Sequence, residues 1–399
     1  MSALKPNSMS ILIAPDKFKG SLTASQVAQS VATGLRRVLN QVAIRCLPVA
    51  DGGEGTVEAA IAAGFKRRQT VVTGPLSQPI TAFWAFQDDE HLPEAVIELA
   101  QASGIELLQP DRDTGYAATS RGTGELLQAA LESGAQRITL GLGGSASTDG
   151  GAGMLTGLGI RLYDANGALI PDGSGELERI RNIDCSGLDP RWTDVEVIVA
   201  SDVDNPLLGS NGAAAIFGPQ KGLLPDDANV LDRGVRHFTA VLTEAVTTEF
   251  GVEAGDQVHQ STTAPGSGAA GGAGFAAMAM MGARRRRGVD VVLDFTNFWA
   301  ALDGISLVIT GEGSLDAQTL SGKAPVGIAQ AAAQRSIPVI AVCGRCQLSD
   351  EQLQQAGFAT VFTLHSLEPD LAKSMSAAIP LLQSIGELIG DTLVTHHGD

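Results

Sequence analysis

The chain has 399 residues, more than one ordinary domain holds, and 44% of them are hydrophobic, so we expect two packed domains rather than disorder. A net charge of −17 argues against a general nucleic-acid or anionic-membrane surface, and an aromatic content of 4% argues against base-stacking platforms. No secretory leader is visible, and the longest weakly polar stretch, 269–281, is too short to span a bilayer. We therefore expect a cytoplasmic protein without nucleic-acid or membrane partners, and we leave open whether it forms a homo-oligomer. We expect residues 1–8 to be a dispensable extension, or Met9 to be an alternative start.

The first elements alternate between strand and helix. Residues 11–14 form a short apolar run that is typical of a strand buried on both faces. Thr23 and Gln26 form a capping box at the start of a helix over 24–39, where apolar residues recur at helical spacing. A strand over 45–49 and a second helix follow. This alternation predicts a parallel sheet.

The middle of the chain shows a different pattern of predicted elements. Three segments around a turn at 88–90 are expected to be antiparallel strands, namely 71–72, 81–86 and 95–98. A helix is expected over 122–133. A glycine-rich loop is then expected to lead into a second helix over 151–159, and a further strand is expected over 195–200. We interpret this part as a mixed α/β domain.

The end of the chain returns to alternating strands and helices. Strands are expected over 307–310, 338–342 and 360–364, and helices over 322–334, 349–356 and 371–388, the last broken at Pro380. We predict an α/β protein of two domains, in which a Rossmann/flavodoxin-like parallel-sheet domain is split by an inserted mixed α/β domain. The discontinuous domain would comprise 9–77 plus 288–390, and the inserted domain 78–287.

Four acidic or glycine-rich loops each follow a predicted buried strand. They are residues 16–21, 51–56, 143–151 and 311–316. Ligands of open α/β sheets lie outside the carboxyl ends of the strands. Small residues let a phosphate approach the backbone, and carboxylates hold a metal or accept a proton. The pattern indicates an enzyme that handles a phosphorylated ligand together with a divalent cation.

The loops at 16–21 and 51–56 differ in how strongly they indicate a site. In the first, Lys17 and Lys19 flank an aromatic residue ahead of a helix, and we favour an anion site over a solvated loop. The second offers the carboxylates of Asp51 and Glu54 on a flexible backbone. It reads equally well as a ligand loop or as a glycine-rich turn.

The loop at 143–151 resembles a phosphate-binding loop in composition, although it lacks the Gly-Lys-Ser/Thr ending of a Walker A motif. Its backbone N–H groups could form an anion-binding nest, and a flexible linker is the alternative. Residues 266–271 match G-x-G-x-x-G without a preceding strand, so we interpret these glycines as helix-packing residues, with contact between their backbone and a ligand as the alternative.

The remaining polar motifs leave alternatives open. The segment 201–206 is expected either to bind Mg²⁺ or to form an Asx-turn. The segment 311–316 is expected either to bind the ligand or to form a structural salt bridge from Glu312 to Lys323. The basic run 284–287 is expected to be a solvated loop or helix end. Cys343 and Cys346 are expected to be ordinary thiols, and the six histidines show no metal-binding spacing.

Six motifs together resemble the type I glycerate kinase family, and the resemblance runs from Met9 to about Leu388. They are APDKFKGSL at 14–22, PVADGGEGT at 48–56, TSRGTG at 119–124, GLGGSASTDG at 141–150, SDVDNP at 201–206 and TGEGSLD at 310–316. The resemblance implies two α/β domains, one Rossmann- or flavodoxin-like and the other of unusual mixed fold, with the active site in the cleft between them. It also implies ATP-dependent phosphorylation of D-glycerate, usually to 2-phosphoglycerate.

We assign candidate roles by the chemistry of phosphoryl transfer, which needs held phosphates, a metal, a cationic clamp and an oriented hydroxyl. The cationic candidates for the glycerate carboxylate and the transferring phosphoryl group are Lys17, Lys19 and Arg121. Asp202 or Asp316 would accept the hydroxyl proton. The candidate Mg²⁺ ligands are Asp51, Asp204 and Glu312. The candidate nucleotide-binding residues are Gly143, Gly144, Ser145, Ser147, Gly150 and Lys221.

Three other functions remain open at this point. A glycerate 3-kinase would give 3-phosphoglycerate, and the motifs do not decide which hydroxyl reacts. A dehydrogenase would use the glycine-rich loops for a dinucleotide, but no fingerprint follows a strand. A non-catalytic sugar-acid sensor would not favour several carboxylates beside an anionic ligand.

Overall fold

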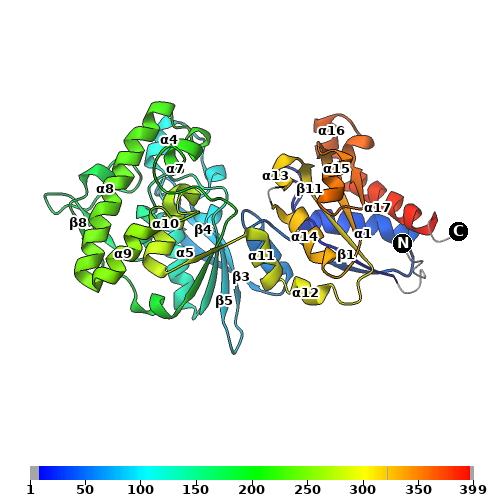
Figure 1. Cartoon of the computed structure of the whole chain (residues 1–399), viewed down its shortest axis with the longest axis horizontal. Helices are drawn as coiled ribbons and strands as arrows, with labels where there is room; N and C mark the ends of the chain where they lie inside the picture. The colour runs from blue at the N-terminus through cyan, green and yellow to red at the C-terminus, as the bar shows by residue number, and fades with distance from the viewer. Residues whose placement is uncertain (1–8, 321, 396–399) are drawn as a thin grey trace. The chain divides into compact units, whose positions relative to one another are not determined.

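The computed structural model describes residues 9–320 and 322–395, and residues 1–8, including the predicted extension, lie outside the described part (Figure 1). The chain forms two compact units. Unit 1 comprises the described residues of Met1–Asp51, Glu58–Gly64 and Arg287–Asp399, and unit 2 comprises Gly52–Val57 and Phe65–Arg286. The predicted class is confirmed, since one unit is built on a parallel sheet and the other on a mixed sheet.

Unit 1 contains a five-stranded sheet in which every neighbouring pair is parallel. In spatial order its strands are β13 (Thr360–Thr363), β12 (Val339–Cys346), β11 (Leu307–Leu315), β1 (Ser10–Ile13) and β2 (Ala43–Cys46). Read from the β2 edge and numbered along the chain within the unit, the strand order is 2-1-3-4-5, which is the flavodoxin-like arrangement. The strand order reverses between β1 and β11, so the loops after these two strands flank the topological switch point.

Helices cover both faces of this sheet because strand side chains alternate between its faces. Ile11 and Ile13 pack with α1 (Ala24–Val38) and α17 (Ala378–Thr395), which contact each other and run side by side in Figure 1. Leu12 packs on the other face with α11 (Gly288–Phe295) and α14 (Ala324–Ala333). The remaining helices of this part are α2 (Thr56–Ala62), which begins in unit 2, α12 (Phe298–Ala301), α13 (Ala317–Leu320), α15 (Asp350–Gln355), η7 (Leu364–Ser366) and α16 (Leu371–Ser376).

Two local predictions in unit 1 can be compared with the structure. The capping box of Thr23 and Gln26 is confirmed, with both reciprocal hydrogen bonds present at the start of α1. The break predicted at Pro380 lies instead at Ala377, between α16 and α17. Pro380 is the third residue of α17, where its missing N–H removes no intrahelical hydrogen bond.

Unit 2 contains a six-stranded mixed sheet. Its order is β10 (Arg284–Arg286), β9 (Glu196–Ala200), β6 (Arg137–Gly141), β5 (Glu94–Glu98), β4 (Pro79–Gln87) and β3 (Lys66–Thr73). The pairs β3–β4 and β4–β5 are antiparallel, as predicted, and the pairs from β5 to β10 are parallel. A separate antiparallel pair joins β7 (Arg161–Tyr163) to β8 (Asn182–Asp184).

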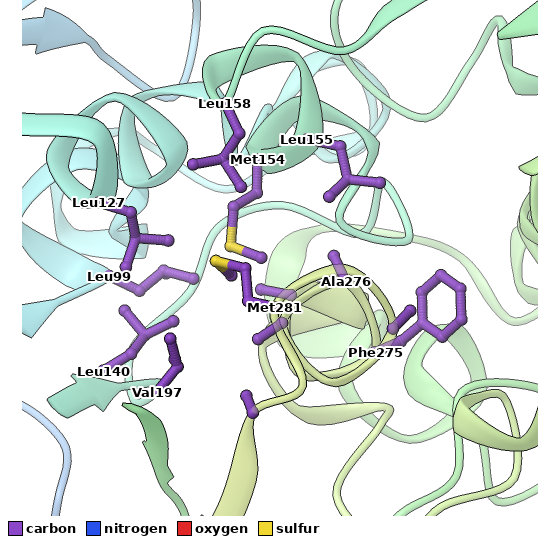
Figure 2. Packing of buried hydrophobic residues seen from close by; sticks show 14 of the residues in the cluster. Leu99, Leu127, Leu140, Met154, Leu155, Leu158, Val197, Phe275, Ala276 and Met281 are labelled. Atoms are coloured by element: carbon purple, nitrogen blue, oxygen red, sulfur yellow. The ribbon is translucent and has the colours of Figure 1, made fainter. Parts of the chain in front are cut away.

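The helices of unit 2 include two that the sequence patterns did not predict, α8 (Pro225–Phe250) and α9 (Val252–Ser261), which contact each other. The others are α3 (Ala100–Ser103), α4 (Arg112–Ala117), α5 (Arg121–Glu132), α6 (Ala152–Gly157), α7 (Ala213–Phe217) and α10 (Ala273–Met281), with short 3-10 turns at η2 (Ile105–Leu107), η3 (Leu177–Arg179), η4 (Pro190–Asp194), η5 (Pro219–Lys221) and η6 (Ala269–Gly272). Figure 2 shows Met154 of α6 and Met281 of α10 pointing toward one another within one hydrophobic cluster.

Two sequence expectations about this unit differ from the structure. The strand β3 pairs with β4, and Phe65–Arg286 belong to unit 2, whereas the first domain was predicted to extend to residue 77. The basic run was expected to be a solvated loop or helix end, and this was wrong. Arg284–Arg286 form β10, which pairs with β9 at the edge of the sheet.

Candidate functional site

The switch point of unit 1 joins two of the predicted loops by backbone contacts. The Asp16 N–H donates to the Gly311 carbonyl at 2.8 Å, and the Thr310 hydroxyl donates to the Ala14 carbonyl at 2.8 Å. These bonds continue the pairing with β11 beyond the end of β1. The side chains that follow are therefore held at the sheet edge where α/β proteins bind their ligands.

Asp16 is a buried carboxyl group at this edge. Burial raises the pKa of Asp16 to about 7, Lys17 opposes the shift, and the carboxylates of Asp51 and Glu312 add to it. The Lys17 ammonium lies 3.8 Å from Asp16 Oδ1, and the Lys17 N–H donates to the same oxygen at 2.6 Å. Sequence reasoning selected the lysines of this loop and missed Asp16. The signal was available, because Asp16 is the second residue after the apolar run 11–14.

Glu312 is the second buried carboxyl group of this edge. It accepts a hydrogen bond of 2.6 Å from the Thr319 hydroxyl, and the Lys323 ammonium lies 3.8 Å from its other oxygen. Burial raises the pKa of Glu312, while Thr319 and Lys323 oppose the shift. The salt bridge from Glu312 to Lys323, which was expected as the alternative to a ligand site, is therefore present. Glu312 nevertheless lies at the switch point of the sheet.

Asp316 has a more local contact pattern than Glu312. Its Oδ1 accepts a hydrogen bond from the Gln318 N–H at 2.8 Å, and its own N–H donates to the Thr319 hydroxyl at 3.0 Å. Asp316 therefore forms the turn that leads into α13, and its side chain is partly exposed. A carboxylate in such a turn can still accept a proton from a ligand.

The predicted metal ligands fall into both units. Asp51 and Glu312 belong to unit 1, whereas Asp204 belongs to unit 2. Within residues 9–320 and 322–395, no group of three or more His, Cys, Asp or Glu residues could by itself hold a metal ion. Mg²⁺ does not require such a cage, since it is usually held by one or two carboxylates plus waters and substrate phosphates. The electrostatically coupled acids of unit 1 fit that kind of site.

In unit 2, the glycine-rich loop at 143–151 follows β6 directly. A Cβ at Gly143 would lie 2.7 Å from the Cα of Gly53, closer than real side-chain contacts allow. Glycine is needed here because the loop packs against the backbone of residues 52–54. The motif at 48–56 thus has its glycines beside the predicted phosphate loop, within the same unit.

Lys221 enters this loop from inside the unit. Its side chain is 2% exposed, and its ammonium donates to Ser145 Oγ at 2.8 Å and to the Ser147 carbonyl at 2.5 Å. Burial lowers the pKa of Lys221 to about 7, and the negative charge of Asp149 opposes the shift. Lys221 therefore supports the loop through Ser145 and Ser147, two of the residues that were predicted with it.

Asp149 fixes the other end of the loop and was not singled out in the sequence. Its carboxylate accepts hydrogen bonds from the Ser120 N–H and hydroxyl, each at 2.8 Å, and from the N–H groups of Gly151 and Gly153. Burial raises the pKa of Asp149, and these hydrogen bonds oppose the shift. The motif at 119–124 is thereby joined to the motif at 141–150.

Two hydroxyl groups of the loop have no recorded hydrogen-bond partner in the part of the chain that is described. They are Ser147 Oγ and Thr148 Oγ1, and both side chains are buried. Buried polar groups are normally hydrogen-bonded, so an unpaired hydroxyl calls for a missing partner such as water or a ligand. Phosphate oxygens are acceptors of the right kind, and the loop therefore fits the phosphates of a nucleotide.

Arg121 is held at the start of α5 by a salt bridge. Its Nε lies 2.8 Å from one Asp172 oxygen and donates to the other at 3.0 Å. The guanidinium is only partly exposed. A role for Arg121 in binding an anion would therefore use the guanidinium nitrogens that Asp172 leaves available.

The segment after β9 is organised by an arginine of β10. Arg285 donates to the carbonyls of Ser201 and Val203 at 3.1 and 3.2 Å, and it forms an ion pair with Asp204. The basic run therefore shapes this acidic segment, which explains why it is not a solvated loop. Asp202 lies between these contacts with an exposed side chain.

The C-x-x-C motif lies within one strand. Cys343 and Cys346 both belong to β12 and pack against the same hydrophobic cluster. All four cysteines are free, and burial raises the pKa of the Cys343 thiol well above its usual range. The expectation of ordinary thiols agrees with this arrangement.

The comparisons with known proteins agree on one family. A family model described as the glycerate kinase family matches residues 11–394. The chain is 43% identical over 357 residues to "Glycerate kinase" of Bacillus subtilis (strain 168), covering 89% of this chain and 90% of that protein. It is 44% identical over 357 residues to "Glycerate 2-kinase" of Escherichia coli (strain K12), with the same coverage.

A solved structure points the same way. The crystal structure of a protein provisionally assigned as glycerate kinase 2 from Salmonella typhimurium LT2 matches with a TM-score of 0.81 and 39% identity, covering 98% of this chain and 99% of that one. The protein is therefore a kinase enzyme. It belongs to the glycerate kinase family, as the six motifs implied. No helix among the described residues is long and apolar enough to cross a membrane.

Proposed function

We propose that the protein transfers the γ-phosphoryl group of ATP to the 2-hydroxyl of D-glycerate, giving 2-phosphoglycerate and ADP. The observation that carries the proposal is the 44% identity, over 89% of the chain, to a relative named glycerate 2-kinase. The geometry of each unit supports it. Unit 1 presents Lys17 beside buried carboxyl groups at a switch point, and unit 2 presents a phosphate-type loop with unpaired hydroxyls.

In the proposed reaction, the 2-oxygen of glycerate forms a bond to the γ-phosphorus as the bond to the β–γ bridging oxygen breaks. ADP leaves with that oxygen, and the hydroxyl proton passes to a carboxylate, for which we keep Asp202 and Asp316 as candidates. The cations proposed to bind the acid and the transferring group are Lys17, Lys19 and Arg121. Their charge would oppose the accumulation of negative charge on the phosphoryl oxygens.

We propose that Mg²⁺ is bound by the carboxylates of Asp51 and Glu312, and that Asp204 contributes only if its ion pair with Arg285 opens. When bound, Mg²⁺ would neutralise phosphate oxygens of ATP. The loop residues proposed to bind the nucleotide phosphates are Gly143, Gly144, Ser145, Ser147 and Gly150, with Lys221 holding the loop in shape.

The remaining expectations stay proposals. We propose that the two compact units are the two domains of the enzyme and that it works in the cytoplasm without nucleic-acid or membrane partners. Whether the chain forms a homo-oligomer stays open.

A coupled assay of ADP release with D-glycerate tests the proposed function, and ³¹P NMR of the product identifies the phosphorylated oxygen. We expect ADP release that depends on D-glycerate and a product signal from 2-phosphoglycerate. A signal from 3-phosphoglycerate would show that the enzyme phosphorylates the 3-hydroxyl instead. Binding of D-glycerate without any ADP release would favour the sensor.

A further inference from the structure

A cavity of about 240 Å³ lies at the carboxyl edge of the sheet of unit 1. Residues that end or follow four neighbouring parallel strands line it, namely Lys19 after β1, Ser314 of β11, Arg345 of β12 and His365 after β13. The helix α16 forms another wall and is tied to the loop after β1, because the Ser21 hydroxyl donates to the Met375 carbonyl at 3.0 Å. Ligands of open α/β sheets bind at this edge.

The cavity has one apolar wall. Phe18 contributes a buried aromatic ring, and Leu371 and Met375 of α16 contribute side chains that are 65% and 38% exposed. Large apolar side chains this exposed beside a cavity leave area that an apolar ligand group can cover. Gly313 and Gly344 also line the cavity, and a Cβ at Gly344 would lie 2.6 Å from the Gly313 carbonyl oxygen.

Other residues of the lining are cationic. Lys19 and Arg345 carry positive charge. The single acidic residue of the described lining is Glu368, and its Oε1 accepts a hydrogen bond from the Asp370 N–H at 3.0 Å, which ties it to its own turn. In a chain with a net charge of −17, a local excess of cations indicates an anionic ligand.

An apolar wall with cationic residues elsewhere in the lining suits a ligand that is apolar at one end and anionic at the other. Of the two substrates in the proposed reaction, D-glycerate is a small acid that is polar throughout. ATP combines a flat heteroaromatic base with phosphates. The cavity is thus chemically matched to ATP rather than to the acid.

We propose that this cavity binds the adenosine end of ATP, with the base against Leu371, Met375 and Phe18 and the phosphates toward Lys19 and Arg345. The proposal rests on the proposed kinase function and adds to it a base-binding pocket in unit 1. It involves residues that none of the six sequence motifs covers, since Arg345 and α16 lie outside all of them.

The test uses two exposed leucines of neighbouring helices. Leu371 lines the cavity, whereas Leu388 of α17 is 42% exposed and does not line it. Calorimetry on the full-length protein would give the Kd for ATP and for inorganic tripolyphosphate, and steady-state kinetics would give KM for ATP and for D-glycerate. The variants are Leu371→Asp, Leu388→Asp and Arg345→Ala.

We expect Leu371→Asp to raise the Kd and the KM for ATP roughly tenfold. The base loses an apolar contact, and the new carboxylate repels the negatively charged phosphates of ATP. Its Kd for tripolyphosphate should change less than its Kd for ATP. Arg345→Ala should weaken ATP and tripolyphosphate together. Leu388→Asp should match the wild type in all four constants, and KM for D-glycerate should stay within about twofold throughout.

Equal ATP affinity in Leu371→Asp, Arg345→Ala and the wild type would overturn the proposal, and so would a rise in KM for D-glycerate in place of ATP. These results leave the proposed function standing if the wild type still phosphorylates D-glycerate. Conversely, selective loss of ATP binding in Leu371→Asp, with no turnover of D-glycerate by the wild type, would uphold the pocket and overturn the proposed function.

Discussion

The ammonium of Lys221 lies 2.8 Å from the hydroxyl oxygen of Ser145, inside unit 2 and out of reach of solvent. A buried lysine is usually paired with a carboxylate, because an isolated charge is costly to remove from water. Here the direct partners are a hydroxyl and a carbonyl, and Asp149 acts only through its charge. This relationship ties the shape of the phosphate-type loop to the protonation state of one lysine.

Stability should therefore depend on pH through Lys221. Burial lowers the pKa of Lys221 from 10.5 to about 7, so between these values the unfolded chain binds more protons than the folded one. Stability then rises with pH over that window, by up to about 1.4 kcal/mol per pH unit. Urea unfolding at pH 7.5, 8.5 and 9.5 should show a gap between wild type and Lys221→Met that moves in the wild type's favour as pH rises. Lys66→Met, which changes an exposed lysine of the same unit, should run parallel to the wild type.

Asp149 should be a large contributor to stability. Asp149→Ala would leave Ser120 and the N–H groups of Gly151 and Gly153 without their acceptor in a buried place. We expect a loss on the order of 3 kcal/mol in the free energy of unfolding, measured by urea titration. The matched control is Asp113→Ala, an exposed acid of the same unit, which should change stability by less than about 0.5 kcal/mol. Equal losses in the two variants would contradict the structural role of Asp149.

The strands of unit 1 and the loops after them could be predicted from sequence because each signal is local. An apolar run followed by Asp16 or by Glu312 marks both a buried strand and its functional end. The burial of those carboxylates could not be predicted in the same way. It depends on β11, which pairs with β1 although nearly 300 residues separate them along the chain.

The parts that sequence reasoning missed depend on contacts that are remote in the chain. Lys221 was predicted as a nucleotide contact because it lies in a turn, and only the fold directs it inward to Ser145. Arg285 was assigned to a solvated run because four consecutive arginines are usually exposed. Pairing with β9 gives the strand conformation, and carbonyl acceptors after that strand satisfy the guanidinium.

Lys17 should be required for turnover. Its ammonium lies beside the buried Asp16 at the switch point, where it can offset negative charge on an acid substrate and a transferring phosphoryl group. We expect Lys17→Ala to lower kcat/KM by about 10²-fold or more, with circular dichroism showing a folded protein. Lys373→Ala, an exposed lysine of the same unit, is the control. Kinetics close to wild type in a folded Lys17→Ala protein would rule out the clamp.

Turnover should also depend on a divalent cation. Excess EDTA should abolish ADP release, and added Mg²⁺ should restore it, because phosphoryl transfer needs neutralised phosphate oxygens. Asp51→Asn and Glu312→Gln each remove one charge from the proposed ligands. Both variants should need more Mg²⁺ for half-maximal rate than the wild type and should recover part of their activity at high Mg²⁺. Full activity in EDTA would exclude the metal.

The proton acceptor can be identified by comparing Asp202→Asn with Asp316→Asn. Asparagine keeps the size of each side chain, and at Asp316 it keeps the turn oxygen that accepts from Gln318, so local structure should survive. Loss of the base should lower kcat by about 10²- to 10⁴-fold while the Kd for ATP stays unchanged. Raising Mg²⁺ should not rescue that variant, in contrast to Asp51→Asn. If both variants keep a kcat within about threefold of the wild type, neither carboxylate accepts the proton, and the buried Asp16 becomes the next residue to change.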